Sequence, residues 1–222
     1  MNNKEKVIVL LSGGLDSAVC LWLMKENNFE IYTITFNYFK RFKKEIQSCL
    51  KIATFAQVKE HKIIDLSFLS EFEDEEYSHS SHLLKIKKFI PANYISSRNL
   101  IYYSIAAWWA EKIGASRIIG GHIKDDIVHF PDTTSEFFSL LTKSINMGNY
   151  GSSSHKYQII IPLHNYTKLD VLEEAIRLDL PINLTWSCQR REDIACGICH
   201  SCKSRLESFR QLGKTDPLEY DL

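Results

Sequence analysis

The chain has no excess of charge of one sign. Its 222 residues include 27 Lys and Arg and 27 Asp and Glu, so the formal net charge at pH 7 is zero. Proteins with an obligatory nucleic-acid or anionic-membrane partner usually present a field of one sign, so the balance argues against both partners. The length suits one α/β domain with a small appended element, because two full domains would be cramped.

Long hydrophobic runs, internal repeats and low-complexity tracts are also missing. The first apolar run, at residues 7–11, is far shorter than the core of a signal peptide or a membrane span. We therefore expect a cytoplasmic protein that does not enter a membrane. Without an export signal, a disulfide framework is not the expected use of the six cysteines.

Short apolar runs alternate with segments of helical periodicity. The expected strands are residues 7–11, 31–36, 61–64, 117–119 and 158–161. The expected helices are residues 17–27, 43–55, 99–113, 135–147 and 168–178, with Thr167 as the N-cap of the last. This alternation predicts an α/β fold with a doubly wound, mostly parallel sheet of five strands. The polar segment at residues 67–96 is expected to be a mobile insertion over the cleft.

A glycine-rich segment, SGGLDS at residues 12–17, joins the first strand to the first helix. Gly13 and Gly14 allow a tight backbone that presents N–H groups, and the helix N-terminus adds partial positive charge. Ser12 and Ser17 add hydroxyl donors, so the segment suits a phosphate site. Asp16 would repel phosphate unless it binds a metal ion, which makes it a magnesium candidate. The simpler alternative is an ordinary turn in which Asp16 or Ser17 caps the helix.

The segment lacks the lysine of a Walker A loop and the third glycine of a dinucleotide fingerprint. Its spacing, S-G-G-x-D-S, resembles the signature of the N-type ATP pyrophosphatases. That resemblance implies an adenine nucleotide alpha-hydrolase-like, Rossmann-like fold that cleaves ATP between its α and β phosphates. The nucleotide-binding residues that it implies are Leu10, Leu11, Ser12, Gly13, Gly14, Leu15, Asp16, Ser17, Asn99 and Gly121.

Four of the six cysteines are crowded near the C-terminal end of the sequence. They are Cys188, Cys196, Cys199 and Cys202, and Gly197 offers a tight turn among them. Four thiolates at this spacing predict a closed, structural zinc site that ties a helix at residues 203–211 to the body. An iron–sulfur cluster, a redox pair, free structural cysteines and His200 as a replacement ligand are the alternatives.

Both motifs, in this order and at this length, resemble the 7-cyano-7-deazaguanine synthase family of the queuosine pathway. The resemblance also covers the runs at residues 36–38, 97–99, 130–132 and 167–168, and the run LTWSC at residues 184–188 is the most specific. It implies that ATP adenylates the carboxylate of 7-carboxy-7-deazaguanine and that ammonia then displaces AMP. A second ATP would drive dehydration of the amide to the nitrile.

The resemblance implies roles for particular residues. Asp16, Ser17, Lys168 and Arg98 would be catalytic, with Arg98 and Lys168 supplying cationic contacts. Asn99 would position the nucleotide or base. The substrate-binding residues would be Phe36, Tyr38, Arg98, Asp132 and Trp186. The alternatives are solvated side chains for Arg98 and Lys168, a cap of the helix near Ser135 for Asp132, and core packing for Trp186.

The resemblance divides the chain into an ATP pyrophosphatase domain at residues 1–185 and a zinc knot with its helix at residues 186–222. The family commonly self-associates, so a homodimer is expected by resemblance.

The chain departs from the family pattern at residues 39–42, 120–122 and 133–134. These departures leave open a paralogue that makes the amide or joins a deazaguanine carboxylate to another molecule. A tRNA-thiolating enzyme and a non-catalytic nucleotide-binding partner are further alternatives. Intact Asp16 and its flanking serines argue against a partner that only binds.

Overall fold

The computed structural model describes residues 4–39, 41–72 and 94–221. Parallel strands form one sheet in the order β3-β2-β1-β4-β5. The strands are β1 (Lys6–Leu10), β2 (Glu30–Asn37), β3 (Glu60–Asp65), β4 (Arg117–Ile119) and β5 (Gln158–Ile160). The chain winds outward from β1 in one direction and then returns to start again at β4, so the strand order reverses between β1 and β4. In open α/β sheets ligands bind beyond the carboxyl ends of the strands at such a reversal.

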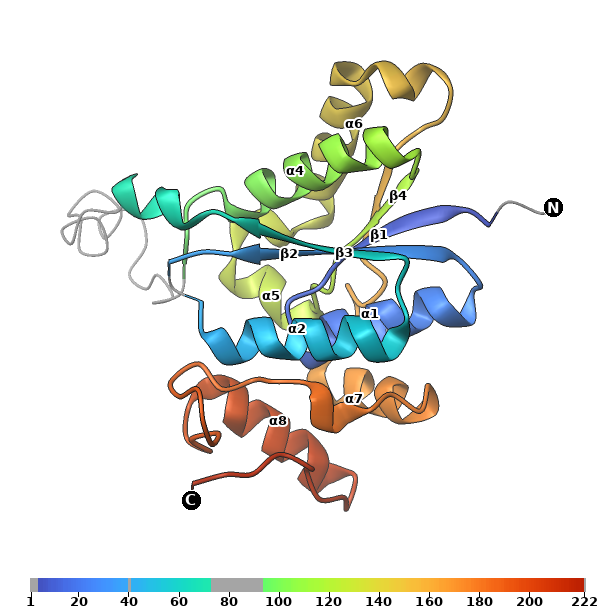
Figure 1. Ribbon diagram of the computed structural model, residues 1–222. Helices are drawn as coiled ribbons and strands as arrows, with labels where there is room; N and C mark the ends of the chain where they lie inside the picture. Colours follow the sequence, from blue (N-terminus) through green and yellow to red (C-terminus); the bar gives the residue numbers. More distant parts are fainter. Residues whose placement is uncertain (1–3, 40, 73–93, 222) are drawn as a thin grey trace.

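Helices cover both faces of the sheet (Figure 1). They are α1 (Leu15–Glu26), α2 (Lys43–Ala56), α4 (Arg98–Ile113), α6 (Ser135–Gly148), α7 (Lys168–Arg177) and α8 (His200–Gln211). In Figure 1, α4 and α6 lie on one face and α1 and α2 on the other, while α8 lies beyond α2 and α7 as an outer layer. The shorter elements are α5 (Lys124–His129), η1 (Ser67–Phe72), η3 (Pro131–Thr133), η4 (Tyr150–Ser153) and η5 (Ile182–Leu184).

The central strand β1 is buried on both sides. Val7 and Val9 pack into the cluster that includes α1, α2 and α7, whereas Ile8 packs into the cluster that includes α4 and α6. Successive strand side chains point to opposite faces, so a strand covered on both faces needs an unbroken apolar run. This explains why residues 7–11 could be recognised as a strand, and the expected five-stranded parallel α/β fold is confirmed.

Helix ends differ from the expected positions where capping decides them. Helix α1 begins at Leu15, so Asp16 and Ser17 lie in its first turn, with the extended residue Gly14 as its N-cap. Helix α8 begins at His200 because Cys199 is its N-cap, with a sulfur that accepts from the N–H of Cys202. The N-cap expected at Thr167 is confirmed, since its Oγ1 accepts from the N–H of Asp170 at 3.3 Å.

The hydrophobic pattern of the sequence did not predict α5, which begins at Lys124, five residues after the end of β4. Of the expected insertion, residues 67–72 form η1 and Ile95 is buried, while residues 73–93 lie outside the described residues. Within the described ranges, the structure contains no helix with the length and apolar character needed to cross a bilayer.

Candidate active site and metal centre

The glycine-rich loop, residues 12–17, lies at the carboxyl end of β1 and leads directly into α1. Gly13 has φ +84°, and a Cβ there would lie 2.5 Å from the backbone oxygen of Glu45, so only glycine fits. The hydroxyl oxygens of Ser12 and Ser17 are 2.9 Å apart, and Ser17 Oγ donates to Gly14 O at 3.1 Å. These bonds brace the loop around the N-terminus of α1, where free amides and the helix dipole favour an anion.

Asp16 and Lys168 meet beside this loop. Lys168 Nζ lies 2.6 Å from Asp16 Oδ1, with side-chain exposures of 17% and 26%. Asp16 is in the first turn of α1 and Lys168 is the first residue of α7, so two helix N-termini converge here. A carboxylate and an ammonium placed together at this edge can hold a cation and an anion respectively.

Gly121 follows β4 and packs against the first turn of α1. A Cβ at Gly121 would lie 2.8 Å from the backbone nitrogen of Ser17 and 2.9 Å from its Cα. The residue therefore needs to be glycine so that the β4 end can approach the loop. This contact brings together two segments that the sequence assigned to one nucleotide site.

Leu10, Leu11 and Leu15 contribute their side chains to the core. Leu11 and Leu15 are almost completely buried. Any contact of Leu11 or Leu15 with a nucleotide must therefore come from their backbone atoms, whereas the side chain of Leu10 is half-buried.

Asn99 and Asp132 bind each other at the start of α4. The backbone N–H of Asn99 donates to Asp132 Oδ2 at 3.0 Å, and Asn99 Nδ2 donates to Asp132 O at 2.9 Å. Asp132 thus caps α4. The alternative interpretation, that Asp132 caps the helix near Ser135, is wrong, because Thr134 Oγ1 accepts from the N–H of Phe137 there. Asn99 is only 3% exposed, which leaves it little surface for a ligand.

An aromatic group flanks Arg98. Phe36 is buried and stacks on Tyr102 with ring centroids 4.2 Å apart, and Tyr38 lies 6.3 Å from Tyr102. Burial raises the pKa of Tyr38, and the positive charge of Arg98 opposes that rise. The Arg98 guanidinium also lies 5.5 Å from the centre of the Phe130 ring. A cation next to flat rings is suited to a planar, anionic ligand.

Trp186 lies between the glycine-rich loop and the cysteines. It is 5% exposed, its backbone N–H donates to Gly13 O at 2.8 Å, and its indole N–H donates to Cys188 O at 3.0 Å. The ammonium of Lys44 lies 5.1 Å from the centre of the Trp186 ring. The side chain thus has a packing role, and its contact with substrate stays a prediction.

Sequence analysis missed Arg41, which lies in a stretch that departs from the family pattern. Its guanidinium donates to Phe36 O at 2.6 Å and also to Ser12 O. It therefore ties the carboxyl end of β2 to the glycine-rich loop. The signal was weak, because one basic residue in a basic run gives no sign of which side chain turns inward.

Asp126, in the first turn of α5, lies close to His122. Its Oδ2 accepts from the N–H of Ile123 at 3.0 Å and lies 3.9 Å from His122 Nδ1. Burial raises the pKa of Asp126, an effect that Asp16 reinforces and that Lys168 opposes. Burial, with Arg98 and His164 nearby, lowers the pKa of His122 to about 3, so this imidazole is neutral at pH 7.

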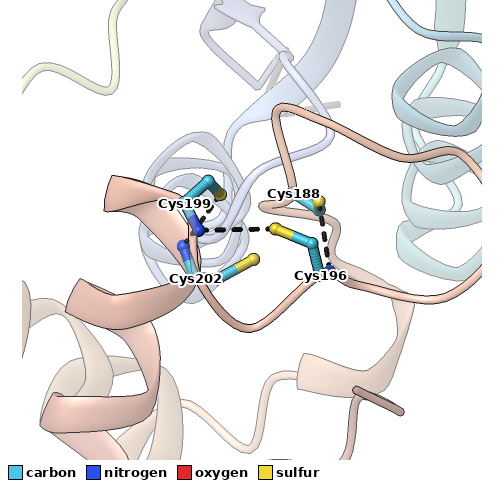
Figure 2. A group of neighbouring side chains, drawn as sticks. All are labelled: Cys188, Cys196, Cys199 and Cys202. Carbon is cyan, nitrogen blue, oxygen red and sulfur yellow. Dashed lines mark hydrogen bonds between the residues drawn. The ribbon is translucent and has the colours of Figure 1, made fainter. Parts of the chain in front are cut away.

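Cys188, Cys196, Cys199 and Cys202 converge on one point (Figure 2). All four are buried, and their sulfur atoms lie within 4.8 Å of one another. Each of the first three sulfurs accepts a backbone N–H bond, for example from Cys196 to Cys188 at 3.4 Å and from Cys199 to Cys196 at 3.4 Å. Such bonds stabilise thiolates, which are the form that binds metal.

The donor set fits a tetrahedral metal ion. Zinc–sulfur bonds of about 2.3 Å place the sulfurs of a tetrahedron about 3.8 Å apart, close to the observed grouping. Burial raises the pKa of Cys196, but backbone N–H groups of Cys199 and Ile198 outweigh it and lower the pKa to about 6. His200 is exposed and does not belong to the group, so it is not placed as a ligand.

Comparisons with known proteins agree over nearly the whole chain. A family model described as "Queuosine biosynthesis protein QueC" matches residues 6–213. The 7-cyano-7-deazaguanine synthase of Oceanobacillus iheyensis is 36% identical over 219 residues, covering 97% of this chain and 98% of that protein. The synthase of Aliarcobacter butzleri is also 36% identical, over 220 residues, covering 97% and 96%.

Solved structures share the fold at lower identity. The U34-tRNA thiolase NcsA from Methanococcus maripaludis, solved with its 4Fe-4S cluster, has a TM-score of 0.53 and 21% identity. The match covers 81% of this chain and 58% of the thiolase. NMN synthetase from Francisella tularensis has a TM-score of 0.52 and 18% identity, covering 96% and 79%. At these identities the likeness concerns the fold alone, whereas the full-length sequence matches establish that the chain is an enzyme belonging to the queuosine biosynthesis protein QueC family.

Proposed function

We propose that this enzyme uses ATP to convert 7-carboxy-7-deazaguanine into 7-cyano-7-deazaguanine. The single observation that carries the proposal is the meeting of Asp16 and Lys168, at 2.6 Å, beside a glycine-rich loop at a helix N-terminus. The names of the full-length relatives supply the product, 7-cyano-7-deazaguanine, and the carboxylate substrate follows from the resemblance in sequence.

The first step activates a poor electrophile. A carboxylate oxygen of the substrate attacks the α-phosphorus of ATP, pyrophosphate leaves, and an acyl adenylate forms. Ammonia then attacks the acyl carbon, AMP leaves with the C–O bonding electrons, and the amide results. Amides of the loop and the side chains of Lys168 and Arg98 would stabilise the charge that develops on the leaving phosphates.

The second step removes water from the amide. Its oxygen attacks a second ATP, and the nitrogen loses two protons as the activated oxygen departs, which leaves the carbon–nitrogen triple bond. The activated oxygen leaves as AMP, with pyrophosphate released beforehand, or as phosphate if ADP is the other product.

Asp16 is proposed as the magnesium ligand of this site. Magnesium takes oxygen ligands and would neutralise the pyrophosphate charge when bound. In this structure the ammonium of Lys168 is paired with the carboxylate of Asp16. When magnesium binds Asp16, the Lys168 side chain would therefore have to move towards the phosphates. Ser17 is proposed to keep the loop closed through its bond to Ser12.

The substrate is proposed to bind near Arg98 and Tyr38. A guanidinium can hold the carboxylate in a bidentate manner, and the ring of Tyr38 offers a face for the flat base. Phe36 would support this wall from behind, where it stacks on Tyr102. Asp132 and Trp186 are proposed to affect substrate binding indirectly. Asp132 holds the start of α4, and Trp186 holds the glycine-rich loop.

The four cysteines are proposed to bind zinc. Four thiolates leave no open coordination position, so the metal would hold the fold and take no part in the reaction. Metal analysis by mass spectrometry distinguishes zinc from iron. Size-exclusion chromatography with light scattering tests the proposed homodimer.

One assay tests the main proposal. Purified protein is incubated with ATP, magnesium, ammonium and 7-carboxy-7-deazaguanine, and mass spectrometry follows AMP, ADP and the base product. Nitrile together with AMP or ADP supports the synthase reaction. Amide as the end product would replace it with the amide-forming reaction of a divergent paralogue, and no nucleotide turnover would refute both.

A further inference from the structure

A backbone hydrogen bond joins the C-terminal region to the glycine-rich loop. The N–H of Trp186 donates to Gly13 O at 2.8 Å. In a trans peptide the C=O of one residue and the N–H of the next point in opposite directions. Holding the carbonyl of Gly13 therefore fixes the direction of the Gly14 amide. Gly13 has φ +84° and little intrinsic preference for one conformation, so an external contact has more influence here than at other residues.

The residues on both sides of Trp186 are held by one buried side chain. Arg205, on α8, is only 1% exposed. Its Nη1 donates to Thr185 Oγ1 at 2.7 Å and to Ser187 Oγ at 3.2 Å, and its Nη2 donates to Ile182 O at 3.4 Å. These three bonds attach the segment at residues 182–187 to α8.

Asp216 balances the charge of this guanidinium. Arg205 Nε lies 2.7 Å from Asp216 Oδ2, and Arg205 Nη2 lies 3.0 Å from Oδ1. A buried cation with a bidentate carboxylate and further acceptors has little freedom to move. Its position is also tied to the cysteine cluster, because the indole of Trp186 donates to Cys188 O and α8 begins beside Cys199.

We propose that Arg205 is a positioning residue for nucleotide binding. Through Thr185, Ser187 and the backbone of Trp186 it holds the glycine-rich loop in the conformation that receives phosphate. The C-terminal region, with its four cysteines and α8, then supports the phosphate site as well as the fold. This inference rests on the proposed function only in taking ATP as the ligand.

The test changes the link and leaves the buried ion pair intact. Thr185→Val keeps the shape of the side chain and removes the acceptor of Arg205, whereas Thr185→Ser keeps the hydroxyl. Tyr220→Phe is the matched control, because the Tyr220 hydroxyl donates to Asp216 Oδ2 at 2.6 Å, on the same ion pair but away from the loop. Each variant is measured as the full chain with its metal content determined.

Two measurements are made on every variant. Hydrogen exchange of the peptide containing residues 11–17 reports the order of the loop without nucleotide, and calorimetry with ATP and magnesium reports affinity. We expect Thr185→Val to speed exchange of this peptide and to weaken ATP binding by about three- to tenfold at unchanged metal content. The variant loses the bond from Arg205 and the bond that the Thr185 hydroxyl donates to Ile182 O at 2.7 Å, whereas Ser187→Ala loses only the bond from Arg205. KM for ATP should rise with little change in kcat. Thr185→Ser and Tyr220→Phe should behave like the wild type.

Unchanged exchange and affinity in Thr185→Val would overturn the proposal. Equal effects in Tyr220→Phe would also overturn it, because they would point to a general loss of stability. If Thr185→Val fails to fold, Ser187→Ala provides the same comparison with the weaker of the two bonds. A wild-type protein that does not bind ATP would refute the proposed function instead, and the exchange measurement would still decide this inference.

Discussion

Lys168 Nζ and Asp16 Oδ1 lie 2.6 Å apart although 152 residues separate them in the sequence. A lysine at the first position of a helix is unfavourable, because the helix N-terminus already carries partial positive charge. Asp16, in the first turn of another helix, offsets that charge. The carboxylate of Asp16, the ammonium of Lys168 and the N-terminus of α7 thus meet at the carboxyl edge of the sheet. The phosphates of a nucleotide would complement the two positive charges, and a bound cation would complement Asp16.

Loss of either member of this pair should abolish most turnover. We expect Asp16→Asn and Lys168→Met each to slow AMP formation by about a hundredfold or more, because both would contact the charge that develops on the phosphates. The measurement is pyrophosphate release at saturating substrates. Lys124→Met is the control, since Lys124 is an exposed lysine on the nearby α5. Full activity in Asp16→Asn would contradict its assigned role.

Gly121 should tolerate no side chain. In Gly121→Ala the new Cβ would meet the backbone of Ser17 at 2.8 Å, so the first turn of α1 would have to shift. We expect ATP affinity to fall by about tenfold or more, because relieving a contact shorter than 3 Å would require the backbone of one of the two segments to move. Gly148→Ala is the matched control, because a Cβ there would meet nothing within 4 Å. Equal affinity in the two variants, measured by calorimetry, would refute the close approach.

Removing one cysteine sulfur should prevent binding of the proposed metal ion. We expect Cys199→Ser to lower the bound metal well below one ion per chain and to lower Tm by several degrees, because metal binding contributes folding energy at such sites. Elemental analysis and a thermal scan measure the two effects. Cys20→Ala is the comparison, since Cys20 is buried in the core outside the group. A normal metal content in Cys199→Ser would exclude a four-thiolate site.

The half-buried imidazole of His122, whose side chain is 19% exposed, should make the protein less stable in acid. Its pKa is about 3 in the folded protein against 6.5 as the ordinary value, so below pH 6.5 the unfolded chain binds a proton that the folded chain does not. Stability therefore falls as pH drops from 6.5 towards 3, by at most about 1.4 kcal/mol per pH unit.

Asp126, whose pKa burial raises, works in the opposite direction, because its folded form binds a proton more readily. His122→Gln isolates the contribution of the imidazole. We expect urea unfolding of this variant to depend less steeply on pH between 6.5 and 4.5 than that of the wild type. Identical slopes would show that His122 is not held neutral.

Some features of the molecule follow from neighbouring residues in the chain. The apolar run at residues 7–11, the helix signal at Thr167 and the crowding of four cysteines each reflect local periodicity, capping or spacing. These are properties that a sequence carries directly, because turns, caps and strand faces depend on residues a few positions apart. The parallel five-stranded sheet could therefore be predicted.

Other features depend on which segments meet. Asp132 lies just before α6 in the sequence, yet its carboxylate caps α4, because η3 packs against the start of α4. Arg41 stands in a basic run, and only the approach of β2 to the glycine-rich loop reveals that its guanidinium reaches Ser12. No periodicity marks either contact, since the partners lie tens of residues apart.

Short spacings in the chain were enough to predict the order of the strands and the longer helices, the glycine-rich loop between β1 and α1, and the group of four cysteines. The pairing of Lys168 with Asp16, the cap that Asp132 provides for α4 and the hold of Arg205 on the segment beside the loop depend on the packed structure. Burial, charge pairing and close approach are properties of the packed chain, because they arise only when folding brings distant segments together.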